Sequence, residues 1–326
     1  MAEDPLDQEG SEGARRGDEP PPWWEQATSM PTPPEGLETA GPRTSEPGQT
    51  DGDAGPAEEG AGELRDWDAE TYDQLADPQE EWGRELVERL ELRGDETVLD
   101  AGCGTGRVTK ALLERLPQGR VIGVDSSPSM IETARQALGD QVELIVADVV
   151  TLELPEPVDL AFSTAAFHWI FDHDALFRNL HRLVRPGGNL AVQFGGAGNI
   201  AMVRAAISQV IRQEPFAEHF EGITRMWNFP TPEDETAILE RAGFANIDCW
   251  LERKTIEPPD PRKYLETICL GAQLDRLPPE KHRDFVARVA SHLPNHEAWM
   301  GWRDDLGRSR QAELEYVRLN VSALRP

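Results

Sequence analysis

The stretch VLDAGCGTGRV at residues 98–108 places three glycines in five positions, directly behind a short apolar run that ends in Asp100. A glycine-rich turn after a strand is typical of nucleotide sites, but its spacing fits neither common phosphate pattern. The dinucleotide pattern G-x-G-x-x-G requires its third glycine at position 107, where this chain has arginine, and the P-loop pattern requires a lysine that does not follow. An acid entering the turn would repel a pyrophosphate. The stretch therefore favours a ligand that carries an ammonium group.

Apolar runs and amphipathic segments alternate downstream of this turn. Residue patterns predict five strands and several amphipathic helices between and after them, which is the pattern of a parallel sheet covered on both faces. The expected strands span residues 97–102, 120–125, 142–148, 158–164 and 189–196. A further helix at 231–244 precedes a strand at 245–252, and residues 312–324 form a last strand. The sequence predicts an α/β, Rossmann-like, doubly wound sheet.

Three acids end three successive predicted strands. They are Asp100, Asp125 and Asp148, and the carboxyl ends of parallel strands meet at the edge where open α/β sheets bind ligands. Asp125 is placed to accept hydrogen bonds from two ribose hydroxyls, and Asp148 to accept one from an adenine amino group. An amino-acid end, a ribose and an adenine together match S-adenosylmethionine.

The motifs resemble those of class I S-adenosylmethionine-dependent methyltransferases. VLDAGCGTG (98–106), GVDSSPSMIETAR (123–135), VADV (146–149) and LVRPGG (183–188) look like the first three motifs of that class and the turn before its fifth strand. WDAETYD and FSTAAFHWIFDHDALFRNLHRLVRPGGNLAVQ are more narrowly similar to the trans-aconitate 2-methyltransferase group, which methylates carboxyl groups of small molecules. The resemblance, over about residues 65–326, implies seven strands with the last antiparallel, and a helical cap.

The resemblance also implies the residues of the site. Tyr72 and Trp82 would close over the cofactor, and Trp67 and the loop after the fourth strand would face the substrate. The expected cofactor-binding set is Tyr72, Trp82, Asp100, Gly102, Gly104, Gly106, Asp125, Ser126, Met130, Asp148, Val149 and Thr164. Asn199 and Arg225 join Trp67 as substrate candidates, and His168 and Trp169 are the candidate catalytic residues.

His168 is the residue that separates the possible chemistries. A carboxylate acceptor is already ionised at neutral pH and needs no general base, whereas a hydroxyl or amine acceptor would use one. The ring could therefore act as a base, bond the substrate, or bond the backbone and shield the pocket. In the resembled group glutamine typically precedes the tryptophan that here is Trp169, so the histidine is a departure that bears on the substrate.

The first 62 residues differ in composition from the rest. They hold ten prolines, ten glycines, fifteen acids and three arginines, which predicts a disordered tail ahead of a methyltransferase domain at 63–326. Trp23 and Trp24 are its one unusual feature. Within the domain, about residues 63–90, 200–230 and 260–300 are expected to form the cap.

Overall charge and cysteine content limit which classes of protein and partner remain. Sixty acidic against 32 basic residues give a net charge of −28, which argues against nucleic acid and anionic membranes as partners. The acidic N-terminus is unlike a signal peptide, and Cys103, Cys249 and Cys269 show no metal-ligand pairing. We expect a cytoplasmic enzyme, a monomer or weak oligomer without a metal, that carboxyl-methylates a trans-aconitate-like acid. Open alternatives are hydroxyl, amine or carbon methylation and a non-catalytic cofactor-binding subunit; a nicotinamide enzyme is more distant.

Overall fold

The computed structural model describes residues 66–69, 73, 75–223, 225–301 and 311–326. The chain divides into two units, Met1–Glu59 and Gly60–Pro326, and all described residues belong to the second. The predicted tail, including Trp23 and Trp24, and the candidate Tyr72 lie outside the described residues. In the described part no helix is long and apolar enough to cross a membrane.

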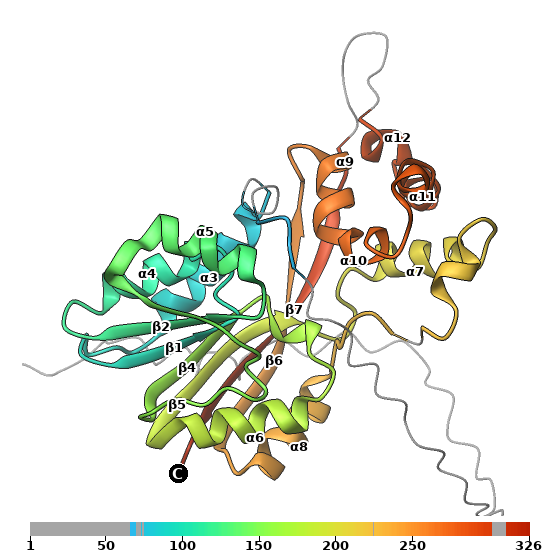
Figure 1. Cartoon of the computed structure of the whole chain (residues 1–326). Helices are drawn as coiled ribbons and strands as arrows, with labels where there is room; N and C mark the ends of the chain where they lie inside the picture. The colour runs from blue at the N-terminus through green and yellow to red at the C-terminus, as the bar shows by residue number, and fades with distance from the viewer. Residues whose placement is uncertain (1–65, 70–72, 74, 224, 302–310) are drawn as a thin grey trace, which may run out of the picture. The chain divides into compact units, whose positions relative to one another are not determined.

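A seven-stranded sheet organises the second unit, with strand order β3-β2-β1-β4-β5-β7-β6. The first five strands run parallel, and β7 lies antiparallel between β5 and β6 (Figure 1). The strands are β1 (Thr97–Ala101), β2 (Arg120–Asp125), β3 (Glu143–Val146), β4 (Val158–Thr164), β5 (Val184–Gly195), β6 (Ala245–Ile256) and β7 (Leu314–Leu324). The predicted fold class is confirmed, including the antiparallel last strand.

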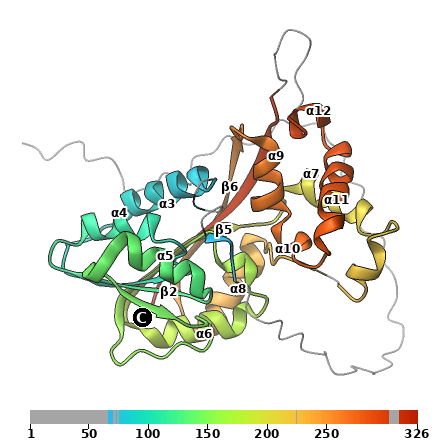
Figure 2. The ribbon, with the colours of Figure 1, turned by 45° about the horizontal axis from the view of Figure 1, so that its top comes forward.

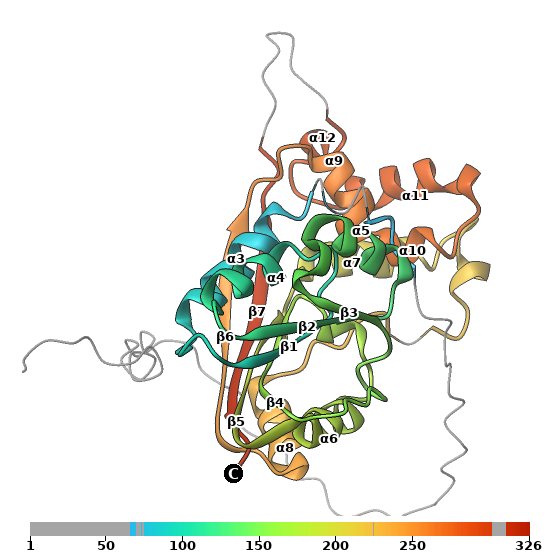
Figure 3. The same ribbon diagram turned by 60° about the vertical axis from the view of Figure 1, so that its left-hand side comes forward.

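Helices cover both faces of the sheet because each carries one apolar stripe. On one face lie α3 (Asp77–Arg89), α4 (Arg107–Arg115) and α5 (Pro128–Leu138), and on the other α6 (His173–Leu183) and α8 (Pro232–Ala242) (Figures 1 and 3). Separate apolar clusters fill the two sides: one joins Leu86 and Val87 of α3 to Leu112 of α4, and the other joins Leu176 and Leu180 of α6 to β4 and β5.

A group of helices beyond the sheet forms a cap (Figure 2). A third apolar cluster fills the space between these helices. Its core includes Tyr264, Phe285 and Trp299, and Leu314 and Tyr316 of β7 connect it to the sheet. The helices around it are α7 (Ala201–Val210), α9 (Pro261–Tyr264), α10 (Gly271–Leu274), α11 (Pro279–Ser291) and α12 (His296–Trp299), with the short turns η3 (Ala217–Phe220) and the π-helical η4 (Leu265–Cys269). In the expected cap segment near residues 63–90, Leu75 and Trp82 pack in the cap cluster, while Leu86 and Val87 of α3 pack beside α4 on the sheet.

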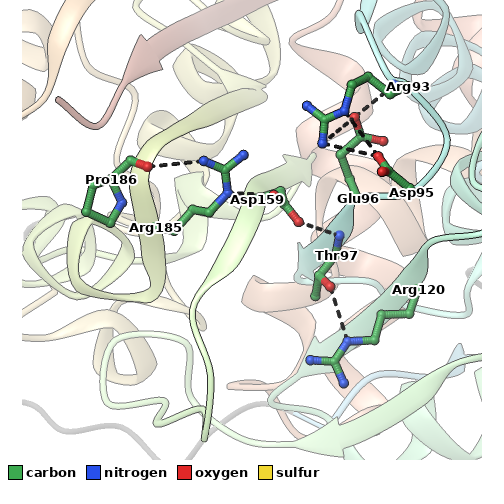
Figure 4. A network of polar contacts seen from close by, with 8 residues as sticks. All are labelled: Arg93, Asp95, Glu96, Thr97, Arg120, Asp159, Arg185 and Pro186. Atoms are coloured by element: carbon green, nitrogen blue, oxygen red, sulfur yellow. Dashed lines mark hydrogen bonds and ion pairs between the residues drawn. The ribbon is translucent and has the colours of Figure 1, made fainter.

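Two strand boundaries differ from the prediction. β5 begins at Val184 rather than at 189, because Val184 pairs with Val158 before a register shift. At this end of the sheet Asp159 links three strands: it accepts hydrogen bonds from Thr97 N (2.7 Å) and from Arg185 Nε (2.6 Å) (Figure 4). β6 continues to Ile256, four residues beyond the predicted end, because it keeps pairing with β7.

Candidate functional site

The glycine turn joins β1 to α4 with three residues in the left-handed region. Gly102, Gly104 and Gly106 have φ of 78°, 54° and 85°. A Cβ on Gly102 would lie 2.3 Å from Ala166 Cβ, and one on Gly106 would lie 2.6 Å from Leu138 Cδ1. At Gly104 a Cβ would meet nothing within 4 Å. The positive φ therefore favours glycine at all three positions, and at Gly102 the contact with Ala166 Cβ also leaves no room for a side chain, while Gly104 borders open space.

Asp100 lies at the end of β1 and is almost fully buried. Its Oδ2 accepts a hydrogen bond from Thr109 Oγ1 at 2.6 Å. Burial raises the pKa of Asp100 to about 7, the hydrogen bond from Thr109 opposes this rise, and the nearby charge of Asp125 adds to it. The carboxyl of Asp100 thus changes protonation near neutral pH and lines a small cavity beside the glycine turn.

Asp125 ends β2 and is held rigidly by backbone donors. Gly104 N donates to its Oδ2 at 3.0 Å and Ser127 N to its Oδ1 at 2.9 Å. Burial raises the pKa of Asp125, and these backbone hydrogen bonds oppose the rise. Each carboxylate oxygen still has a lone pair available, since a carboxylate has about four acceptor positions. Asp125 lines the larger cavity and could accept two further hydrogen bonds there.

Asp148 is placed differently from the other two acids. Its Oδ1 accepts a hydrogen bond from Val150 N at 2.8 Å, which closes the turn after β3, and it lines neither cavity. Ser126 and the buried Val149 also lie outside the cavity lining. Met130, on the first turn of α5, does line the larger cavity. The ligand contacts expected at the β3 end therefore stay a prediction.

The described residues 66–69, 73 and 75–80, which we call the strap, contact the segments that follow β1 and β2. Asp66 Oδ1 accepts hydrogen bonds from Ser127 Oγ (2.6 Å) and Ser129 N (3.1 Å), which fixes the neighbouring Trp67 against the cavity. Further along, Thr105 Oγ1 donates to Asp73 Oδ1 at 2.7 Å. The strap is thus tied to the glycine turn and to the start of α5.

The end of β4 supplies the opposite wall. Thr164, Ala165 and Ala166 line the larger cavity, and Ala165 has a φ of 56°, a conformation that costs energy for a residue with a Cβ. The following 3₁₀ turn η2 (Phe167–Trp169) carries His168 and Trp169 into the same cavity. Strain at this point is consistent with a functional site.

His168 is a neutral ring in this environment. Burial lowers its pKa to about 3, and the electrostatic effects of Arg318 and His173 contribute to the lowering. Gly195 N donates to His168 Nδ1 at 3.4 Å, so Nδ1 is the acceptor nitrogen and the ring hydrogen lies on Nε2. The ring consequently offers an N–H donor rather than a free base.

Aromatic rings form much of the wall around His168. The rings of Trp67 and Trp169 meet edge to face at 5.1 Å, and Trp227 stacks on Phe229 at 5.8 Å with an interplanar angle of 8°. All four rings line the larger cavity. They make an apolar surface that excludes water from a bound ligand.

The candidates therefore divide into two groups. The larger cavity brings together Trp67, Gly102, Gly104, Asp125, Met130, Thr164, His168, Trp169 and Asn199, and the smaller one adds Asp100. Trp82, Gly106, Ser126, Asp148, Val149 and Arg225 line neither cavity. Trp82 is buried behind the cavity against Tyr316, and the guanidinium of Arg225 lies 4.8 Å above the Phe171 ring. Asn199 also has a structural role, because its Oδ1 accepts a hydrogen bond from Val317 N.

Sequence reasoning missed several lining residues that come from distant elements. Gln79 of α3 lines both cavities, and Tyr316 and Arg318 of β7 line the larger one. No local sequence pattern separates Arg318 from the other cations of the chain. Its position inside the apolar run of a predicted strand is a usable signal, because a charged side chain is rarely fully buried there unless it is paired.

The three cysteines are not reactive candidates. Burial raises the pKa of Cys249 to about 11 and that of Cys269 to about 12, and burial together with Asp100 and Asp125 raises the pKa of Cys103 well above its usual value. All three thiols are free. Their surroundings favour the protonated, unreactive form.

Comparisons with known proteins agree with this geometry. Residues 98–188 match a family model described as a methyltransferase domain. A trans-aconitate 2-methyltransferase of Methylobacterium nodulans is 32% identical over 237 residues, which cover 71% of this chain and 90% of that protein. A trans-aconitate 2-methyltransferase of Azoarcus sp. is 46% identical over 127 residues, 39% of this chain and 50% of that protein, so this match spans half of the relative's length.

Among solved structures, the YcgJ protein of Bacillus subtilis aligns with a TM-score of 0.51 at 15% identity. The alignment covers 75% of this chain and 98% of the other, and at this identity it supports the fold alone. The sheet order, the glycine turn and the extended match to the Methylobacterium protein lead to one assignment. The chain belongs to the class I S-adenosylmethionine-dependent methyltransferases, in the family that includes trans-aconitate 2-methyltransferase.

Proposed function

We propose that this chain transfers the methyl group of S-adenosylmethionine to a carboxylate of a small organic acid. The observation that carries the proposal is the state of His168. Its lone pair at Nδ1 accepts a backbone hydrogen bond and its pKa is lowered to about 3 by burial, so the ring is a poor general base. A carboxylate acceptor needs no base, whereas a hydroxyl or ammonium acceptor must lose a proton.

The residues around the glycine turn fit the cofactor. Gln79 Oε1 is buried and has no hydrogen-bond partner among the described residues, while Gln79 Nε2 donates to Tyr264 OH at 2.9 Å. A ligand ammonium would satisfy this oxygen, and Asp100 lines the same small cavity. Asp125 has lone pairs left for ribose hydroxyls, and Gly104 leaves space for close approach. We propose that Ser126, Met130, Asp148 and Val149 complete the nucleoside side.

When bound, the cofactor supplies an activated methyl group on a positively charged sulfur. A carboxylate oxygen of the acceptor forms a bond to the methyl carbon, the carbon–sulfur bond breaks, and its electron pair goes to sulfur. Positive and negative charges cancel and no proton moves. The aromatic rings of Trp67, Trp169, Trp227 and Phe229 exclude water, which favours a step that neutralises charge.

The names of the relatives suggest trans-aconitate as the first acceptor to test. We further propose that the enzyme acts in the cytoplasm and does not bind nucleic acid. The net charge of −28, which repels polyanions, supports the second of these proposals. A monomeric or weakly oligomeric state stays a prediction.

Transfer of a labelled methyl group to a panel of organic acids tests the function. Carboxyl methyl esters hydrolyse in mild base and release labelled methanol, whereas methyl ethers, N-methyl and C-methyl products keep the label. Base-labile product is expected. Base-stable product would move the acceptor to a hydroxyl, amine or carbon, and cofactor binding without any transfer would favour a non-catalytic subunit.

A further inference from the structure

Five rings form a connected aromatic surface on the larger cavity. The ring of Trp169 lies 5.2 Å from that of His168 and 6.2 Å from that of Trp227. The ring of Phe229 lies 5.7 Å from the first of these two rings and 5.8 Å from the second, so the four rings form a closed circuit of contacts. Trp67 joins the circuit at Trp169, and all five residues line the cavity. Such an aromatic surface is complementary to a flat, apolar group.

The aromatic surface comes from elements other than those that fit the cofactor. His168 and Trp169 belong to η2, which follows β4, and Trp227 and Phe229 belong to the segment that precedes α8. Ile268 of η4, in the cap, adds another apolar side chain to the cavity lining. The residues that fit the cofactor lie in the turns after β1 and β2 and at the start of α5. The aromatic surface is therefore available to the methyl acceptor.

The charged groups that line this cavity are few. Among its described lining residues, Arg318 is the only lysine or arginine and Asp125 is the only carboxylate. The guanidinium of Arg318 lies 5.1 Å from the centre of the Trp82 ring and donates to Gln193 O at 3.4 Å. A carboxylate taken out of water costs free energy unless a positive charge or hydrogen-bond donors compensate it. The positive sulfur of the bound cofactor compensates the one carboxylate that accepts the methyl group, and the described lining holds no cluster of cations for further carboxylates.

His168 supplies a polar group within the aromatic surface. Its Nδ1 accepts a hydrogen bond from Gly195 N at 3.4 Å, so the ring hydrogen lies on Nε2 and the ring is a donor. Aromatic surfaces can also bind cations, but an N–H donor suits an oxygen of the ligand and not an ammonium group. The surface therefore fits an acid with an apolar remainder better than it fits an amine.

We propose that the aromatic surface selects acceptors that carry one carboxylate on a planar, apolar body, in preference to polycarboxylates. This inference rests on the proposed function and names the class of acid that is methylated. Trans-aconitate, which has three carboxylates, represents the other class. One of its carboxylates would receive the methyl group, and the other two would lie in a cavity whose described lining is largely aromatic and holds a single cation.

Titration calorimetry on enzyme saturated with S-adenosylhomocysteine measures the binding of trans-cinnamate, crotonate and trans-aconitate. These acids share a carboxylate on an unsaturated carbon chain and differ in what the chain carries: a phenyl ring, a methyl group or further carboxylates. We expect trans-cinnamate to bind about tenfold or more tightly than either of the others, because its phenyl ring buries apolar area that they lack. The kcat/KM for transfer of a labelled methyl group should be highest for trans-cinnamate as well.

Trp227→Leu removes one ring of the aromatic surface, and Phe229→Leu, at the ring stacked on it, is the second variant. Each should weaken trans-cinnamate binding about tenfold and change crotonate binding little, because crotonate has no ring to stack. Trp250→Leu is the matched control: Trp250 is partly buried like Trp227, but it lies on β6 and lines neither cavity. The control should keep the preference for trans-cinnamate. Binding of S-adenosylhomocysteine shows which variants are folded.

The outcomes separate the inference from the proposed function. The inference is overturned if no acid binds, if trans-aconitate binds as tightly as trans-cinnamate, or if the folded ring variants keep the trans-cinnamate preference. If trans-aconitate gives a base-labile methyl ester with a higher kcat/KM than trans-cinnamate, the inference fails while the function stands. If trans-cinnamate binds with the expected preference but no ester forms from any acid, the aromatic site stands and the proposed function fails.

Discussion

Asp100 should make cofactor affinity depend on pH close to neutrality. Burial raises its pKa to about 7. The hydrogen bond from Thr109 lowers the pKa, and the charge of Asp125 raises it further. A ligand ammonium in the adjoining cavity stabilises the ionised carboxylate, so only that form binds well. Affinity for S-adenosylhomocysteine should therefore rise as pH increases through 7.

The size of the effect follows from the fraction ionised. With a pKa of about 7, about one tenth of Asp100 is charged at pH 6 and about nine tenths at pH 8. The dissociation constant should fall about tenfold over that interval, which is about 1.4 kcal/mol. Binding at pH 6 should release nearly one proton, and binding at pH 8 almost none.

The raised pKa of Asp100 has the opposite effect on the stability of the unliganded protein, which should fall as pH rises. The unfolded carboxyl has a pKa of about 4, so between pH 4 and pH 7 the folded state binds more protons than the unfolded state. The stability contributed by protonated Asp100 is thus present below about pH 4 and is lost as pH rises through about 7. The loss is on the order of 4 kcal/mol.

Titration calorimetry at pH 6, 7 and 8, in buffers of different ionisation enthalpy, measures both affinity and proton release. Asp100→Asn should flatten both dependences, while Asp140→Asn, at an exposed position, should leave them intact. The pKa of Asp125 is also raised by burial, so a small residual slope in Asp100→Asn belongs to that residue. A wild-type affinity that does not change with pH, or an unchanged slope in Asp100→Asn, would refute the reasoning.

Three further predictions concern stability and positioning. Gly102→Ala places a Cβ 2.3 Å from Ala166 Cβ at a φ of 78°, so thermal melting should show a loss of at least about 1 kcal/mol and S-adenosylhomocysteine binding should weaken. Asp159→Asn should cost about 1 kcal/mol at pH 7 by urea unfolding. Hydrogen bonds to Asp159 lower its folded pKa despite burial, so the difference from wild type should vanish as pH falls below about 4. Glu235→Ala removes the carboxylate oxygen that lies 2.9 Å from Nδ1 of the buried His173, whose Nε2 contacts Phe167 O. The free energy of unfolding should fall by about 3 kcal/mol, and turnover should fall because Phe167 belongs to η2. An unchanged melting temperature would contradict this.

The fold could be predicted from the sequence because each strand and helix carries its own signal. Apolar runs that end in acids, such as the one before Asp100, and capped helices, such as the one that begins after Ser127, are local patterns. The boundaries of β5 and β6 could not be read in the same way. Val184 joins β5 by pairing with Val158, and the extension of β6 depends on β7, so both boundaries depend on partners distant in sequence.

The residues of the site can be divided in the same way, into those that a local pattern indicates and those that depend on distant partners. Residues within the motifs, such as Gly104, Asp125 and His168, line the larger cavity as expected from their positions at strand ends. Gln79 and Arg318 reach the cavities only because α3 packs beside the glycine turn and β7 inserts between β5 and β6. No short pattern encodes that proximity. The sequence therefore indicates residues of both candidate groups at the cavities, but not those that only tertiary packing brings there.

The glycine spacing has a structural cause that also explains the residue at 107. Gly106 takes the left-handed conformation at the start of α4 and packs against Leu138, so the turn closes one residue earlier than in the dinucleotide pattern. Position 107 then begins the helix, and Arg107 contacts Asp77 and Glu80 on α3 and the carbonyl oxygen of Asp73. A glycine at 107 could not make these contacts. The glycine spacing that argues against a bound pyrophosphate therefore also places an arginine at position 107, where it holds the strap.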